Sequence, residues 1–478
     1  MFSPSLRSNS SSSSIRSIGN SPSEQPWLDP YSSRGSGMIT PPSDVSTPTS
    51  EKAFSGLFEP VATSDRSQSF SISPNDEPTV AVLGVGYVGT HLVSAFSSKY
   101  PVIGFDVSKS RINDLRASQL NEPVDNSRDI EYTWDTRTLS RATHFLVSVP
   151  TLLRPDRTVD ASFLCSALQT VEKHARPGAT IVIESSVAVG MTRELLGPLA
   201  LKRGFFAGMS PERVDPGRTE PPVSSIPKII SGLDDLRPGS LDSIKRIYSS
   251  VFDTVIPVSS PEVAEMTKLY ENCQRMVCIA YANEMADACS SHSIDPYEVC
   301  RAAATKPFGY MNYVPGLGVG GHCIPVNPFY LLSNSSFPLL EHATNHMRER
   351  PRRVALQILN DLQDKKTLNG SDQKKKPRIL TVGMGFKKGQ STLSHSPGLE
   401  LLKALHTADE LDLTWADTHV TQDAIRGVPK LPDALWNSSD LATFDVILLA
   451  FLQPDMDGKV LDSLPAHVEV KWLSMKPT

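Results

Sequence analysis

A glycine-rich turn directly after an apolar run restricts the fold of this chain more than any other feature. The segment Gly84-Val85-Gly86-Tyr87-Val88-Gly89 follows Val80 to Leu83 and opens a helix-like stretch, Thr90 to Phe96. Glycines in this setting allow a tight turn, so that a pyrophosphate can lie at the helix N-terminus. Asp106 ends the next apolar run, where a carboxylate can accept hydrogen bonds from ribose hydroxyls and would repel a 2′-phosphate. The pattern predicts NAD binding; the alternative is a glycine turn followed by a solvated Asp.

Strand-like and helix-like stretches alternate after this turn, which is typical of a doubly wound parallel sheet. The strand-like runs are Val80 to Leu83, Val102 to Phe105, Thr143 to Val149, Thr180 to Glu184 and Ile226 to Ser231. From Pro261 to about Ser291 apolar residues recur at three- and four-residue spacing, which predicts one long helix suited to an interdomain spine or a dimer interface. Further helix is expected from about Leu339 to Asp364. Strand signals then resume at Arg378 to Val382, Asp412 to Trp415 and Asp445 to Phe451, which predicts a second, smaller α/β unit.

Composition excludes several classes of protein. The chain has 478 residues with 47 basic and 52 acidic side chains, so no global positive field draws it to nucleic acid or an anionic membrane. No apolar stretch is long enough to span a bilayer. The six cysteines lack CxxC pairs, which favours a reduced compartment, and we expect a cytoplasmic protein. Residues 1–76 are rich in Ser and Pro and are predicted to be a disordered tail.

Cys323 lies in a glycine-rich stretch, Pro315 to Pro325, rather than in an apolar stripe. Packing explains such a cysteine poorly, and a thiolate nucleophile is the functional interpretation. The glycine N–H groups around it could also cradle a second phosphate group. By contrast, the cysteines in helical segments, namely Cys273, Cys278, Cys289 and Cys300, are most simply small core residues.

From about Thr79 to the C-terminus the chain resembles the UDP-glucose/GDP-mannose dehydrogenase family. The resemblance rests on GVGYVG, on the runs Ser210 to Val214 and Lys268 to Asn272, and above all on GVGGHCIPV around Cys323. It implies an NAD-binding Rossmann domain over 79–258, a central helical dimerisation domain over 259–364 and a UDP-sugar-binding domain over 377–478. The implied fold is thus two Rossmann-like doubly wound parallel sheet domains joined by a long central helix. With His322 and Val326 around the cysteine, the chain resembles the branch of the family that oxidises UDP-N-acetylhexosamines.

The resemblance also implies a reaction, the four-electron oxidation of C6 of a UDP-sugar to the acid with two NAD. Cys323 matches the nucleophile that forms a thiohemiacetal and then a thioester. Lys268 and Asn272, spaced i and i+4 on one helix face, match residues that donate hydrogen bonds to the C6 oxygen. Glu212 matches the carboxylate that activates the hydrolytic water, and Ser186 stands where the family commonly has a water-binding Thr. Without the resemblance, Lys268 would be a solvated lysine, Asn272 a surface amide and Glu212 part of a salt bridge in a loop.

The expected binding residues form two groups, one for the cofactor and one for the substrate. The expected cofactor-binding residues are Gly84, Gly86, Tyr87, Val88, Gly89, Asp106, Arg111, Pro150 and Thr151. The expected substrate-binding residues are Lys268, Asn272, Tyr313, Gly316, Gly320 and Lys387. No metal site is predicted, and the expected partners are a UDP-sugar and further copies of the chain in a homodimer or higher homo-oligomer.

Two positions and one segment depart from the family pattern. Asn327 stands where the family carries an Asp that helps take up the alcohol proton, and an amide cannot act as a carboxylate base. Phe308 replaces an Arg that often reaches the partner subunit's substrate, and the segment Phe386 to Pro397 lacks two acids and an arginine. These departures leave alternatives open: a catalytically weak member that binds NAD and a nucleotide sugar as a sensor or subunit partner, an enzyme that stops at the aldehyde or uses another sugar, and a UDP-glucose 6-dehydrogenase.

Overall fold

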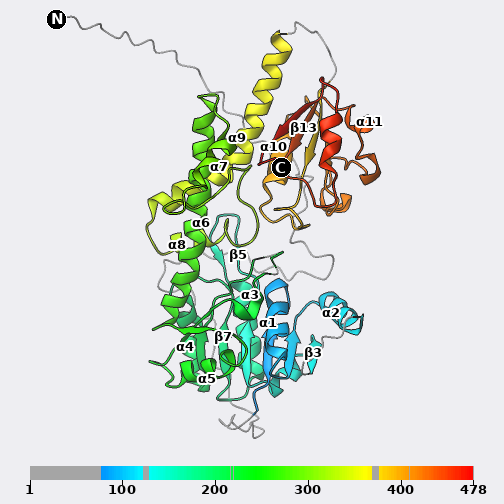
Figure 1. The fold of residues 1–478 in the computed structure, drawn as a ribbon. Coiled ribbons are helices and arrows are strands. Elements are labelled where there is room, and N and C mark those ends of the chain that lie inside the picture. The colour runs from blue at the N-terminus through cyan, green and yellow to red at the C-terminus, as the bar shows by residue number, and fades with distance from the viewer. Residues whose placement is uncertain are drawn as a thin grey trace, which may run out of the picture.

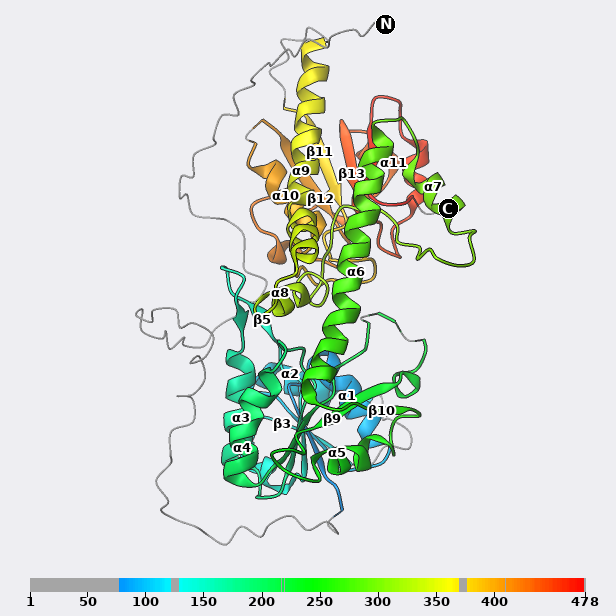
Figure 2. The same ribbon diagram turned by 90° about the vertical axis from the view of Figure 1, so that its left-hand side faces the viewer.

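The computed structural model describes residues 77–121, 129–215, 217–218, 220–368, 376–408 and 410–476. The predicted tail over residues 1–76 lies outside the described residues. Figures 1 and 2 show two sheets at opposite ends of the described chain, with long helices running between them. No helix in the described ranges is long and apolar enough to cross a membrane.

The first sheet has eight strands in the order β10-β9-β8-β7-β4-β1-β2-β3. In chain order these strands are β1 (Val80–Leu83), β2 (Val102–Phe105), β3 (Ile130–Thr133), β4 (His144–Val147), β7 (Thr180–Ile183), β8 (Phe206–Met209), β9 (Lys228–Gly232) and β10 (Val255–Pro257). Neighbouring strands pair in parallel, as predicted, except β8 and β9, which pair antiparallel. The expectation of an entirely parallel sheet is therefore corrected at this one junction. Because β9 runs the other way, it begins at the edge where β8 ends, and the connecting segment stays at that edge.

Helices cover both faces of this sheet, which explains why its strands read as continuous apolar runs. Along β1, Ala81 and Leu83 point into one core and Val80 and Val82 into the other. The first core includes side chains of α3 (Ser162–His174) and α4 (Met191–Arg203). The second core includes side chains of α1 (Tyr87–Ser97), α2 (Lys109–Asn121) and α5 (Ser240–Tyr248). A short hairpin of β5 (Leu152–Leu153) and β6 (Val159–Asp160) follows β4.

The predicted long helix is confirmed as α6 (Pro261–Ser290). At 1.5 Å per residue it is about 45 Å long. Near its start the buried carboxylate of Glu265 accepts hydrogen bonds from the backbone N–H groups of Gly190 (2.6 Å) and Thr192 (2.8 Å), which satisfies donors at the N-terminus of α4. The helix then passes α7 (Pro296–Ala303) and α8 (Asn327–Leu332) and packs on α9 (Pro338–Leu368).

The second sheet closes the chain, as predicted, with four parallel strands in the order β12-β11-β13-β14. These strands are β11 (Arg378–Val382), β12 (Asp412–Ala416), β13 (Val446–Leu449) and β14 (Glu469–Trp472), with α10 (Pro397–His406) and α11 (Ser438–Leu441) beside them. One core of this unit includes Ala355 and Ile358 of α9, so α9 packs directly on the second unit. The two units are thus joined through α6 and α9 (Figure 2).

Candidate active site

The predicted site residues gather where strands of the first sheet end. Gly84 follows β1, Asp106 follows β2, Pro150 and Thr151 come after β4, and Ser186 comes after β7. Glu212 follows β8 on the segment that the antiparallel β9 keeps at this edge. Ligands of α/β sheets bind at the carboxyl ends of parallel strands. This edge is therefore the place at which the fold positions a dinucleotide.

The glycine turn leaves no room for side chains at two of its positions. Gly84 has φ +86°, and a Cβ there would lie 2.5 Å from the carbonyl oxygen of Ser148. A Cβ on Gly89 would lie 1.9 Å from the carbonyl oxygen of Gly84. At Gly86, by contrast, a Cβ would meet nothing within 4 Å, and no side chain caps the N-terminus of α1. The turn therefore presents an open helix N-terminus, which fits a pyrophosphate.

Asp106 and Arg111 hold this turn in place. The Asp106 carboxylate accepts hydrogen bonds from the backbone N–H groups of Val85 (3.1 Å) and Ser108 (2.9 Å), and Arg111 Nε donates to the Val85 carbonyl at 2.9 Å. Asp106 thus lies beside the turn at the end of β2, where a ribose is expected. A carboxylate at this point fits NAD rather than a cofactor with a 2′-phosphate.

The other expected cofactor residues line the same edge. The hydroxyl of Tyr87 donates to the Asp215 carbonyl and accepts from the Gly217 N–H, both at 3.3 Å, so it ties α1 to the segment that carries Glu212. Val88 lines a small cavity of about 20 Å³ that Glu212 also lines. Pro150 is exposed and Thr151 half-buried.

Glu212 and Lys268 form a buried ion pair. Lys268 Nζ lies 3.1 Å from a carboxylate oxygen of Glu212 and donates to the Glu212 carbonyl at 2.5 Å. The other carboxylate oxygen of Glu212 accepts from the Val214 N–H at 2.8 Å. One turn further along α6, Asn272 Nδ2 donates a hydrogen bond to Asn327 Oδ1. The helix therefore presents both predicted donors on the face that meets Glu212 and α8.

The Cys323 loop joins this group through α8. The Cys323 carbonyl accepts from the Asn327 N–H at 2.9 Å, so the cysteine and the buried Asn327 sit at the start of one short helix. Burial raises the pKa of the Cys323 thiol; the charge of Glu212 raises it further, and that of Lys268 opposes the rise. The resting side chain is consequently a thiol at neutral pH, flanked by a carboxylate and an ammonium group.

A segment of the second unit packs against the Cys323 loop. The Gly321 N–H donates to the Ser394 carbonyl at 2.9 Å, and His395 Nδ1 lies 3.1 Å from the Gly321 carbonyl oxygen. A Cβ on Gly320 would lie 2.9 Å from Pro397 Cδ. Lys387 reaches across the two units, with its Nζ 3.0 Å from Asp215. Gly320 and Lys387 therefore lie between the sheets, on the side expected for the sugar nucleotide.

Three predicted residues stand apart from this hydrogen-bond network. Among the described contacts, the side chains of Ser186 and Tyr313 make no hydrogen bond with Cys323, Lys268 or Glu212. The Gly316 N–H donates to Asn283 at 3.0 Å, and its carbonyl accepts from Arg350 at 3.1 Å, so Gly316 is fixed to the seam between α6 and α9. Its placement supports the Cys323 loop from the helical side.

Sequence reasoning missed a buried charged group behind Glu212. Lys228 Nζ lies 2.5 Å from the Glu184 carboxylate and 3.3 Å from the Pro211 carbonyl, and the Tyr248 hydroxyl donates to Glu184. Burial raises the pKa of Glu184 and, with the neighbouring Glu184 charge, that of Tyr248. Because Lys228 holds the carbonyl next to Glu212, it helps to set the position of that residue. The available signal was a lysine at the start of an otherwise uncharged strand, Lys228–Gly232.

The fold and this edge define an NAD-binding dehydrogenase. Family models agree: the NAD binding domain of the UDP-glucose/GDP-mannose dehydrogenase family matches residues 78–252, and the central domain of that family matches residues 262–345. The chain belongs to the UDP-glucose/GDP-mannose dehydrogenase family. The resemblance, the fold class and the NAD cofactor expected from the sequence are thereby confirmed.

Individual relatives agree with this assignment. The chain is 32% identical over 404 residues to Protein CapL of Staphylococcus aureus, with 80% of this chain and 91% of that protein covered. It is 36% identical to a UDP-N-acetyl-D-glucosamine 6-dehydrogenase of Pseudomonas aeruginosa over 68% of this chain and 79% of that one. A solved structure of a UDP-D-ManNAc dehydrogenase from Pyrococcus horikoshii superposes with a TM-score of 0.72 at 25% identity, with 84% of this chain and 96% of that chain covered.

Proposed function

We propose that this chain oxidises C6 of a UDP-N-acetylhexosamine from the alcohol to the carboxylate. The observation that carries the proposal is the cluster of Cys323, Lys268, Glu212 and Asn272 at the carboxyl edge of the NAD-binding sheet. Two similar proteins carry names of UDP-N-acetylhexosamine dehydrogenases, which supports this substrate class over UDP-glucose. The reaction consumes one water and two NAD and yields the acid and two NADH.

Each residue of the cluster has a role in this proposal. Bound NAD would supply the hydride acceptor, with one NAD molecule used for each of the two hydrides that leave C6. Lys268 and Asn272 donate hydrogen bonds to the C6 oxygen and stabilise its negative charge as the alcohol proton leaves. The Cys323 sulfur adds to the aldehyde carbon, and its proton passes to the oxygen. After the second oxidation, Glu212 takes a proton from water as that water displaces the thiolate from the thioester.

Asn327 supports a second candidate function. Its buried amide occupies the position of the family's Asp and is hydrogen-bonded to Asn272 rather than placed as a base. A catalytically weak member that binds NAD and a nucleotide sugar as a sensor or subunit partner would tolerate that amide. We propose the dehydrogenase because Cys323, Lys268 and Glu212 are all present.

The assembly and domain roles belong to the same proposal. We assign NAD binding to residues 79–258, dimerisation and the cysteine loop to 259–364, and UDP-sugar binding to 377–478. A homodimer built on α6 would cover the apolar side chains that this helix exposes, among them Tyr270 and Tyr281.

The test measures NADH formed per sugar consumed with UDP-N-acetylglucosamine, UDP-N-acetylmannosamine and UDP-glucose. Two NADH per sugar with an N-acetylated substrate is the expected result. One NADH per sugar would indicate release of the aldehyde, and no NADH with retained binding of both ligands would favour the non-catalytic member. Preference for UDP-glucose would overturn the proposed substrate class.

Two cysteine variants make the test specific. Cys323→Ser should abolish acid formation while leaving NAD binding intact, because the thioester cannot form. The matched control is Cys278→Ser, since Cys278 is also half-buried but lies within α6. Unchanged acid production by Cys323→Ser would refute the covalent mechanism.

A further inference from the structure

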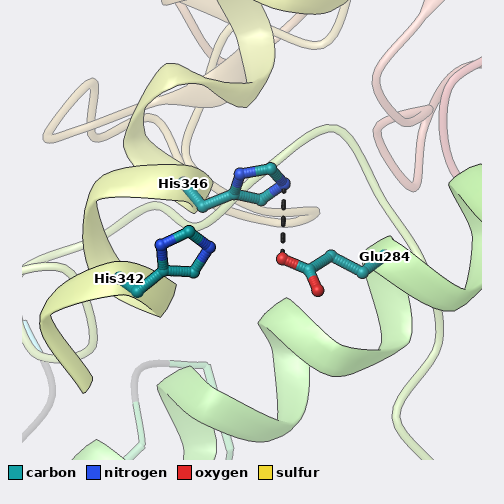
Figure 3. A group of neighbouring side chains, drawn as sticks. All are labelled: Glu284, His342 and His346. Atoms are coloured by element: carbon teal, nitrogen blue, oxygen red, sulfur yellow. Dashed lines mark ion pairs between the residues drawn. The ribbon is translucent and has the colours of Figure 1, made fainter. Parts of the chain in front are cut away.

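Three side chains with metal-ligating atoms meet at the seam between α6 and α9, away from the proposed active site at Cys323. Glu284 comes from α6, and His342 and His346 come from α9 (Figure 3). One ligand atom from each residue lies within 4.8 Å of the others. His346 Nε2 is 3.5 Å from a Glu284 carboxylate oxygen, and the two imidazole rings stack with centroids 5.8 Å apart.

The backbone fixes this grouping. His342 and His346 are four residues apart on one helix, so they lie on the same face, one turn above the other. The facing helix is held in register by a paired contact one turn further on, where Arg350 donates to both carboxylate oxygens of Asp287 at 2.6 and 2.8 Å. Glu284 is one helical turn before Asp287, so the same register presents its carboxylate to the two imidazoles.

The three groups have the chemistry of a zinc-type site. Two imidazoles and one carboxylate are a common three-residue ligand set for Zn²⁺, with a fourth position left to water. Metal ions bind the neutral form of an imidazole, which leaves a ring nitrogen free to act as a ligand. Glu284 and His342 are exposed, so an ion can reach the site from solvent.

Only small movements are needed to close the ligands around an ion. Atoms bound to Zn²⁺ at about 2.0–2.1 Å in a tetrahedron are about 3.3 Å apart. In the structure the three ligand atoms lie within 4.8 Å of one another, so each pair has to approach by at most about 1.5 Å. Changes of side-chain rotamer at the exposed Glu284 and His342 would allow this approach.

Arg353 is the group that competes with an ion. Its Nη atoms lie 3.0 and 2.8 Å from the two ring nitrogens of His346. A bound dication would repel this guanidinium, which has to move off the ring. Arg350 is different, because Asp287 already pairs with it.

We propose that Glu284, His342 and His346 bind a divalent cation of the zinc class that bridges α6 and α9. The bound ion would brace the seam at which Arg350 holds the Gly316 carbonyl, on the segment that leads to Cys323. The proposed metal site takes no part in the dehydrogenase reaction, so the metal proposal does not depend on that reaction.

The test uses the full chain, stripped with EDTA and titrated with Co²⁺, whose visible absorption reports its ligands. The wild type should bind one more equivalent of Co²⁺ than the double variant His342→Ala/His346→Ala. The spectrum of this additional Co²⁺ should lack a thiolate charge-transfer band, which distinguishes it from Co²⁺ bound to cysteines. Each single His→Ala change should weaken this binding by at least about 10- to 100-fold, since changing even a hydrogen-bond partner of a ligand has an effect of that size. His292→Ala, in an exposed turn after α6, is the matched control and should bind as the wild type does.

Two further measurements keep the proposal falsifiable. Arg353→Gln should tighten Co²⁺ binding, because it removes the competing cation, and weaker binding would contradict the assigned role of His346. Zn²⁺ should raise the Tm of the wild type and not that of the double variant, whose Tm in EDTA tests its folding. Equal stoichiometry and affinity in the wild type and the double variant would overturn the proposal.

Discussion

The Cys323 thiol is half-buried and has charges of both signs near it. Because burial and Glu212 raise its pKa above the ordinary value of 9.0, the thiolate fraction at pH 7 is small. The thiolate is the nucleophile, so we expect alkylation of Cys323 by iodoacetamide to rise about tenfold per pH unit from pH 7 to 9. Mass spectrometry of the peptide that contains Cys323 measures this rate, and a plateau below pH 8 would contradict the expectation.

Two charged residues near Cys323, Glu212 and Lys268, provide tests of opposite sign. Glu212→Gln removes the anion that raises the thiol pKa, so labelling at pH 7 should become faster. Lys268→Met removes the cation that lowers the pKa, so labelling should become slower. A shift in the same direction for both variants would show that access, rather than charge, controls the thiol.

Asn327→Asp restores a carboxylate at the place where the family has one. If catalysis is limited by the missing base, the rate of NADH formation should rise about 100- to 10,000-fold. Steady-state kinetics with the preferred UDP-sugar measures the gain, and Asn113→Asp, an exposed change on α2, is the control for added negative charge. An unchanged rate would mean that the site works with the amide.

The charged group behind Glu212 makes a different prediction, about stability. Lys228→Met would leave Glu184, which is fully buried, without its cation. Removing one partner of a buried pair costs about 3–5 kcal/mol of unfolding free energy. Urea denaturation should show this loss for Lys228→Met and a smaller one for Lys228→Met/Glu184→Gln, in which neither charge of this pair remains. Equal losses in the two variants would argue against an electrostatic origin.

Strands that are buried along their whole length could be predicted from the sequence, whereas β3, β8, β10 and β14 were not predicted. β8 is mostly buried but contains Ala207 and Gly208, residue types that are depleted in strands, so it gave no strand signal. All four residues of β1, β2, β4 and β7 are buried, and each stood out as an apolar run. β3 has two half-buried residues and one exposed, and β14 has four half-buried residues. These edge strands carry mixed side chains because only part of each is covered, so no continuous run marks them.

Some features of the candidate site could also be predicted from the sequence, and others could not. Motif spacing and family resemblance pointed to Cys323, Lys268, Asn272 and Glu212. In the structure these residues form two hydrogen-bonded groups beside α6, one of Lys268 with Glu212 and one of Asn272 with Asn327 and the Cys323 carbonyl. The role of Lys228 depends on Glu184, which lies 44 positions earlier, and contact of the Cys323 loop with Phe386 joins residues from separate units. Pairings between distant segments are set by the tertiary fold, so local patterns in a single sequence do not reveal them.

The contact between the Cys323 loop and the second unit can be tested at one glycine. Gly321 has φ +92°, and a Cβ there would lie 3.0 Å from two ring carbons of Phe386. Gly321→Ala should therefore displace the loop and lower kcat with little change in NAD binding. Gly204→Ala is the control, because it has φ +65° with nothing within 4 Å and lies after α4. Equal effects of both changes would assign the loss to backbone strain alone.

For the molecule as a whole, the exposed apolar side chains of α6 predict that the chain associates with further copies of itself. Tyr270 is 71% exposed and Tyr281 is 61% exposed, and Met266 and Met285 are exposed on the same helix. Light scattering after size-exclusion chromatography should show a dimer or a larger species for the wild type. Tyr270→Glu/Tyr281→Glu should shift the chain toward monomer, whereas Leu201→Glu, an exposed change on α4, should not. A monomeric wild type would contradict the prediction.

The attachment of α6 to α4 through Glu265 gives the long helix a fulcrum. Lys268 and Asn272 lie only about 5–11 Å along the helix from that point, whereas Asp287 lies about 33 Å away. A tilt of one degree about Glu265 moves the two site residues by about 0.1–0.2 Å and Asp287 by about 0.6 Å, given a rise of about 1.5 Å per residue. A small tilt of α6 about Glu265 would therefore displace the second unit several times further than Lys268 and Asn272. The proposed reaction site would keep its geometry while the two units shift relative to each other.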